Sequence, residues 1–188
     1  MNKSKSTLSD QMKTLNVEFR KKGEDPWRGW HKIVPIFFFI VGIFSRSSKR
    51  QFYRMWTVLN NIIYCPDPER VLSNLNHYTG IIRHEMVHIM DDMAHPVKFK
   101  LGYVLSRKRR AFYEYRGYTQ DMIFEFQRTG EVSDRTIERL ARLFRGPAYF
   151  WMHRKPMPVL EAIRDAITSG KVVGFENEPL NTIIKENM

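Results

Sequence analysis

The segment from Thr79 to Met93 constrains the fold most strongly, because its apolar residues repeat with the period of an α-helix. Ile82, Met86, Ile89 and Met93 follow one another at three- and four-residue spacing and form a single stripe along that helix. Most of the stability of such a helix comes from packing its apolar face against other parts of the chain. The sequence therefore predicts a helix of about four turns with one face in a folded core.

This predicted helix carries the pattern HEMVH, which begins at His84. His84 and His88 lie about 40° apart on one helical face, so their imidazoles can converge on one metal ion. Glu85 lies about 100° round from His84, where its carboxylate could act as the general base for a water molecule at that ion. The alternative is an amphipathic helix with two surface histidines. It is disfavoured because an unpaired Glu85 near the buried side would be costly.

A tetrahedral catalytic metal site needs a third protein ligand. Glu114 is the best candidate, because it lies on the flank of the buried face of a second predicted helix, Ser106 to Thr129. Asp121 and Glu125 lie on the same side of this helix and are rival ligands or hydrogen-bond partners. A salt bridge to a local arginine is the alternative role for Glu114.

Asp91 shares a face with both histidines and is predicted to orient an imidazole by a hydrogen bond rather than to chelate the metal. A third histidine ligand on the same segment is excluded. The metzincin spacing requires a glycine and a histidine where this chain has Asp91 and Ala94, and His95 comes one residue too late.

The HEMVH pattern with a glutamate on the following helix resembles the zincin metallopeptidases of gluzincin type. The stretches RRAFYEYRGY and FRGPAYFWM are also similar to uncharacterised metallopeptidases of bacteria and phages. The specific match spans residues 55–128. It implies a mostly helical α+β fold with a zincin-like core, in which a small sheet and the HExxH helix precede a second ligand-bearing helix. It also implies a zinc-dependent peptidase, a hydrolase, in which His84, His88 and Glu114 hold Zn²⁺ and Glu85 is the general base.

The chain departs from the gluzincin pattern at Tyr118, where many of those enzymes have an aspartate four residues after the ligand glutamate. The resemblance also implies that a strand before the motif helix, predicted here over Met55 to Tyr64, pairs with extended substrate. The donor that would stabilise the oxyanion is open, and the candidates, each of which could equally be a packing residue, are Tyr115, Tyr118, Tyr149 and His153.

The remaining pattern predicts one domain over residues 23–170, after a polar N-terminal arm at 1–22 and before a C-terminal tail at 171–188. Helices are predicted at 134–144, after a capping serine, and at 158–169, before a glycine. The tail is predicted to be a short strand or irregular. A chain of 188 residues with 43% hydrophobic residues is long enough and apolar enough to bury one core.

The formal net charge of +11 predicts a basic surface with weak, non-specific affinity for polyanions. The apolar run at residues 33–44 is shorter than the roughly 20 residues of a membrane span, so it is predicted to be buried, with interfacial membrane contact as the alternative. A single cysteine, Cys65, excludes an intramolecular disulfide. Without a visible secretory signal, a cytoplasmic location is expected, with association with a virion as the alternative.

Two other classes of function stay open. The chain could be a metal-stabilised structural or adaptor protein that retains the HEMVH motif without turnover. It could also be a basic protein associated with nucleic acid or a membrane. The sequence does not assign a substrate, a cleavage preference or an oligomeric state.

Overall fold

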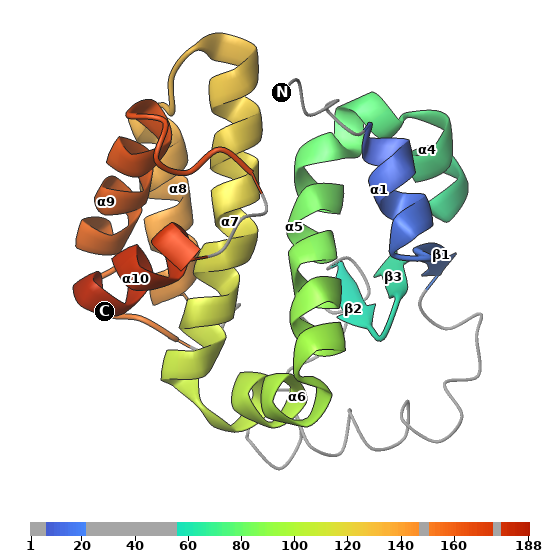
Figure 1. Cartoon of the computed structure of the whole chain (residues 1–188), viewed down its shortest axis with the longest axis horizontal. Coiled ribbons are helices and arrows are strands. Elements are labelled where there is room, and N and C mark those ends of the chain that lie inside the picture. The colour runs from blue at the N-terminus through green and yellow to red at the C-terminus, as the bar shows by residue number, and fades with distance from the viewer. Residues whose placement is uncertain (1–6, 22–55, 147–150, 175–177) are drawn as a thin grey trace. The chain divides into compact units, whose positions relative to one another are not determined.

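The computed structural model describes residues 7–21, 56–146, 151–174 and 178–188 (Figure 1). The described part is mostly helical with one small sheet, as predicted. The chain forms two compact units, residues 1–76 and 77–188. The predicted domain boundaries at residues 23 and 170 stay a prediction, and the apolar run at 33–44 lies outside the described residues.

The first unit contains a three-stranded sheet with short helices before and after it. Its elements are α1 (Leu8–Thr14), β1 (Glu18–Lys21), β2 (Thr57–Leu59), β3 (Ile62–Cys65) and α4 (Pro68–Ser73). The strand order is β1-β3-β2, with β1 parallel and β2 antiparallel to β3. The predicted N-terminal arm therefore contributes a helix and an edge strand that pairs with residues distant in sequence.

The prediction of one strand from Met55 to Tyr64 was wrong, although Met55 itself lies outside the described residues. The chain reverses at Asn60, which has a left-handed backbone with φ 55, and Val58 pairs with Ile63 across the antiparallel ladder. Asparagine tolerates this conformation better than most residues and is common in turns. The consecutive asparagines at 60 and 61 were the signal that the strand prediction overlooked.

The helices of the second unit are α5 (Leu75–Ala94), α6 (Pro96–Leu105), α7 (Arg107–Thr129), α8 (Asp134–Arg145), α9 (Met157–Thr168) and α10 (Glu178–Asn187). Helix α5 ends directly before His95, because Pro96 disfavours helical backbone at the residue before it. Helix α7 begins after the capping Ser106 and ends at Gly130, whose φ of 84 makes it a left-handed cap. The apolar stripe of α5 is buried except for Met93, which is 63% exposed.

Two helices of this second unit were not predicted. Helix α6 lies between the two predicted helices, where no element was predicted, with Pro96 at its first turn and Phe99 and Gly102 buried. Helix α10 occupies the predicted strand or tail, and its Leu180 and Ile184 are buried in the core of the unit. Both helices are ten residues long, which is too short for a weak periodic pattern to be decisive.

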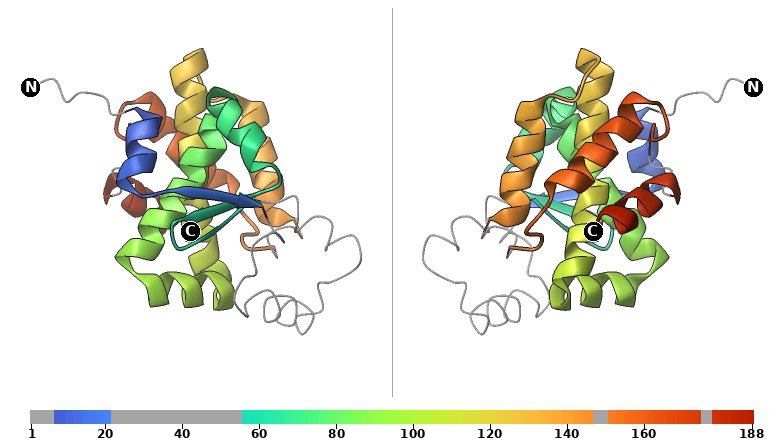
Figure 2. Two further views of the ribbon diagram at one scale, coloured as in Figure 1. Left: turned by 90° about the vertical axis from the view of Figure 1, so that its right-hand side faces the viewer. Right: turned by 90° about the vertical axis from the view of Figure 1, so that its left-hand side faces the viewer.

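The core of the second unit lies on the predicted buried face of α7. Helices α8, α9 and α10 pack together and against α7. In Figure 1 they lie on one side of α7, and the right-hand view of Figure 2 looks onto them from that side. Tyr115 and Met122 of α7 are fully buried there beside Phe144 of α8. Helix α6 packs against α7 as well. This packing leaves another face of α7 free to meet α5, and there the motif residues lie.

Within the described ranges, no helix combines the length and the hydropathy that a membrane span would need.

Candidate metal centre

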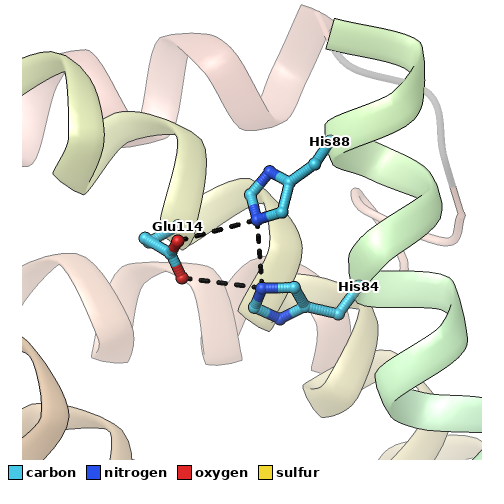
Figure 3. A group of neighbouring side chains, drawn as sticks. All are labelled: His84, His88 and Glu114. Atoms are coloured by element: carbon cyan, nitrogen blue, oxygen red, sulfur yellow. Dashed lines mark hydrogen bonds and ion pairs between the residues drawn. The ribbon is translucent and has the colours of Figure 1, made fainter. Parts of the chain in front are cut away.

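Helices α5 and α7 bring His84, His88 and Glu114 together (Figure 3). The histidines project from one face of α5, and the glutamate reaches them from the second turn of α7. All three side chains are buried, with residue exposures of 5% for His84, 5% for His88 and 2% for Glu114. These residues therefore form a buried group that could hold a metal ion.

The distances within this group fit a small tetrahedral ion. The two Nε2 atoms lie 3.2 Å apart. Glu114 places Oε2 3.5 Å from Nε2 of His84 and Oε1 3.6 Å from Nε2 of His88. Bonds of about 2.0–2.1 Å at tetrahedral angles would hold ligand atoms about 3.3 Å apart. Among the described residues, the buried Oε2 atom of Glu114 has no hydrogen-bond partner, which is costly unless a cation satisfies it.

Gly117 makes room for the first histidine. A Cβ atom at this position would lie 2.7 Å from Nε2 of His84 and 2.8 Å from two of its ring carbons. The imidazole thus rests directly against the backbone of α7, and Tyr118 packs on it edge to face with the ring centroids 4.5 Å apart. The sequence interpretation did not identify Gly117. Its signal was a glycine in the interior of a long helix, where glycine costs about 1 kcal/mol relative to alanine.

Tyr103 of α6 donates a hydrogen bond from its hydroxyl to Oε1 of Glu114. This residue was not identified from the sequence either. The end of α6 is held in turn by Arg110, which donates to the backbone oxygens of Tyr103 at 2.7 Å and of Val104 at 2.8 Å. Because Tyr103 occupies one carboxylate oxygen, the other is left for the space between the histidines. No motif spacing points to this tyrosine, since it lies on a helix that was not predicted.

The electrostatics of His84, His88 and Glu114 favour a positive charge in the space between them. Burial alone would lower the pKa of His84, but the carboxylates of Asp121 and Glu114 outweigh burial and raise this pKa well above 6.5. Burial lowers the pKa of His88 to about 4, although Glu114 opposes the shift. Burial would raise the pKa of Glu114, but its interactions with His84 and His88 hold it below 4.5. The carboxylate therefore stays ionised and attracts a cation or a proton.

The rival acids take other positions. Asp121 approaches the opposite nitrogen of His84, with Oδ2 3.8 Å from Nδ1, so its place is behind the imidazole rather than among the three ligand atoms. Glu125 accepts a hydrogen bond from the hydroxyl of Ser133 at 2.7 Å. Of the three acids considered on α7, Glu114 alone belongs to the group that could hold a metal.

The prediction that Asp91 orients an imidazole was wrong. Its carboxylate forms a buried ion pair with Arg116 of α7. Both residues are buried, each with 7% exposure, and the ion pair joins α5 to α7. This pair ties together the two helices that carry the metal group, and a second carboxylate, Asp121, takes the place beside an imidazole that was expected for Asp91.

The structure gives contacts for some, but not all, of the proposed general base and oxyanion donors. Glu85 is buried beside the first histidine in sequence, and its role as a general base stays a prediction. Among the candidate oxyanion donors, Tyr115 pairs with His153, whose Nδ1 lies 2.6 Å from its hydroxyl oxygen, and Tyr118 packs on His84. Tyr149 lies outside the described residues.

Comparison of the chain with protein-family models, with curated proteins and with solved structures gave no significant match.

Proposed function

We propose that the chain is a zinc-dependent peptidase in which His84, His88 and Glu114 hold the metal and Glu85 handles the proton. The observation that carries the proposal is the convergence of two imidazole nitrogens and one carboxylate from two helices, with the three ligand atoms within 4.8 Å of one another. Two nitrogen ligands and one oxygen ligand suit Zn²⁺, and three protein ligands leave one coordination position for water or substrate.

Bound zinc would polarise a substrate carbonyl and lower the pKa of a water molecule. The protein would supply the rest of the chemistry. Tyr103 holds one carboxylate oxygen of Glu114, and Asp121 supports the far side of the His84 ring. Glu85, one residue from a ligand and buried, would accept the proton of the attacking water and deliver it to the leaving amine. Tyr118, beside His84, stays a candidate oxyanion donor.

One observation favours a second candidate, a metal-stabilised protein without turnover. The three ligands are almost completely buried in the described structure, and structural metal sites are closed whereas catalytic sites keep an open position. In this case the ion would fasten α5 to α7, and its binding free energy would be part of the folding free energy.

The test has two parts. Elemental analysis of the full-length protein, dialysed without chelator, should give about one zinc per chain. Turnover of a mixed peptide library should then fall by roughly 10²-fold or more in Glu85→Gln, while zinc content and melting temperature change little. Glu161→Gln, an exposed glutamate on α9, is the matched control and should keep full activity.

The outcomes separate the two candidates. Zinc content near zero that added zinc does not restore would reject the metal site itself. Stoichiometric zinc without hydrolysis in the wild-type protein would favour the structural role. Hydrolysis that survives Glu85→Gln would refute the assigned general base.

A further inference from the structure

A hollow of about 470 Å³ lies within the second unit, and none of the residues that line it belongs to the metal group. Its described lining consists of Arg107, Arg145, Trp151, His153 and Arg154. These residues come from the start of α7, the end of α8 and the segment before α9. No carboxylate is among them, so three guanidinium groups share one concave surface whose described lining holds no acidic residue.

The three arginines also have no acidic partner among the described residues. In the part of the chain that the structure describes, none of Arg107, Arg145 and Arg154 forms an ion pair or a side-chain hydrogen bond. Other arginines of this unit do pair with acids, as Arg116 does with Asp91 and Arg164 does with Asp134. Gathering like charges without counter-charges opposes folding, and an anionic ligand in the hollow would offset that cost.

Trp151 presents a large aromatic ring at the edge of this hollow. The residue is 53% exposed, and its backbone is left-handed with φ 49, an uncommon conformation for a bulky side chain. Two backbone hydrogen bonds hold it there. The Trp151 amide donates to the oxygen of Gly146 at 3.0 Å, and the His153 amide donates to the oxygen of Phe144 at 3.2 Å. An exposed tryptophan held in this way can stack on a planar ligand.

His153 adds a neutral hydrogen-bond donor. Burial strongly raises the pKa of Tyr115, so its hydroxyl keeps its proton and can donate to Nδ1 of His153, 2.6 Å away. Burial also lowers the pKa of His153, which favours the neutral ring. A neutral imidazole that accepts at Nδ1 carries its proton on Nε2, and that nitrogen can donate to a ligand oxygen.

From this lining we infer that the hollow binds single-stranded nucleic acid, with backbone phosphates on the three arginines and one base stacked on Trp151. Arginine forks match phosphate oxygens, and sequence-tolerant stacking on an exposed aromatic side chain is a common mode of single-strand binding. Trp151 distinguishes this ligand from a simple anion, because a free phosphate offers no ring to stack. The inference does not depend on the proposed peptidase function, since it uses none of the residues of the metal group.

Fluorescence anisotropy with a fluorescein-labelled oligothymidylate and the full-length protein tests the inference. Arg145→Gln/Arg154→Gln should weaken binding and reduce the slope of log affinity against log salt by about 1.4, because roughly 0.7 counterion is released per phosphate contact in single strands. Arg128→Gln/Arg139→Gln removes the same charge from exposed arginines elsewhere on α7 and α8 and should leave the slope nearly unchanged. Equal losses in both double variants would overturn the inference, because net charge alone would then explain binding.

Stacking is tested separately. Trp151→Ala should weaken oligothymidylate binding roughly tenfold but should barely alter binding of an abasic oligonucleotide of the same length. Circular dichroism melting of each variant checks that the fold persists. Equal wild-type affinity for abasic and thymidylate oligonucleotides would reject base stacking. Tighter binding to phosphatidylserine vesicles than to the oligonucleotide, or full displacement of the oligonucleotide by millimolar inorganic phosphate, would reject nucleic acid as the ligand.

Discussion

The imidazole of His84 lies against the backbone of Gly117, where a single added methyl group would approach its Nε2 atom to 2.7 Å. The nearest obstacle at Gly117 is therefore a proposed ligand atom rather than a flexible surface side chain. The helix interior is a poor place for glycine, so this position is best explained by the close approach of the ring. The geometry of the candidate metal centre thus depends on a residue that would not bind metal.

Gly117→Ala should reduce zinc affinity, because the new methyl group displaces His84 from the ligand position. Helix propensity alone predicts the opposite direction for stability, a gain of up to about 1 kcal/mol. Gly102→Ala on α6 is the control, since there the added atom meets the flexible side chain of Arg109 at 2.8 Å. Competition with a chromophoric zinc chelator measures the affinity. Unchanged affinity in Gly117→Ala would show that the ring does not need this position.

Glu114→Ala should lower zinc affinity and also remove the increase in melting temperature that added zinc gives the wild type. A ligand present at about 100 times its Kd stabilises the folded state by roughly 2.7 kcal/mol. Glu125→Ala on the same helix should behave as wild type, because its carboxylate accepts from Ser133 instead. If affinity falls in Asp121→Ala but survives Glu114→Ala, the third ligand is misassigned. Differential scanning fluorimetry with and without zinc is sufficient.

Tyr103→Phe should weaken zinc binding by roughly 10- to 100-fold, the usual effect of removing a group that orients a ligand. The change deletes only the hydroxyl that donates to Glu114, and the ring can keep its contact with Phe99. Tyr113→Phe serves as the control, because Tyr113 also packs on Phe99 but, within the described residues, forms no hydrogen bond or ion pair with the metal group. Equal zinc affinities in the two variants would show that the Tyr103 hydroxyl does not support the metal site.

The Asp91–Arg116 ion pair leads to a prediction about pH. Burial raises the pKa of Asp91 to about 6, from an ordinary value of 3.8, although Arg116 opposes the shift. Between these pH values the folded state binds more protons than the unfolded state, so the contribution of Asp91 to stability falls as pH rises. The rise of about two units in the pKa of Asp91 corresponds to a change of roughly 3 kcal/mol in the free energy of unfolding.

The free energy of unfolding of the wild type, relative to Asp91→Asn, should therefore decrease from pH 4 to pH 6 and then level off. Urea denaturation in the presence of chelator measures it without a contribution from metal. A wild-type advantage that grows over this range would mean that Arg116 dominates and that the pKa of Asp91 is lowered.

The sequence by itself determined the features that depend on neighbouring residues. The spacing of His84 and His88 places both imidazoles on one face of any helix, whatever surrounds it. Pro96 ends α5, Ser106 begins α7 and Gly130 ends it, because caps and proline act on the backbone within one turn. For that reason the predicted end of the first helix at Met93 and both predicted ends of the second, at Ser106 and Thr129, agree with the structure to within one residue.

Only the tertiary structure decided which residues of different helices meet. Periodicity gives the angle between residues of one helix, but the face that α7 turns toward α5 depends on packing. Asp121 and Glu125 share a side of α7 with Glu114, so the sequence could rank the three but could not choose among them. Helix α6 delivers Tyr103 to Glu114 across a bend that no short pattern encodes.

Gly117 also depends on packing between helices, because its role becomes apparent only when the His84 ring lies against it. The same holds for Asp91, which meets Arg116 of another helix rather than the imidazole one turn away along its own. Local spacing specifies which side chains can act together on one element. The burial of polar groups, which must find partners wherever the fold provides them, determines which side chains actually meet.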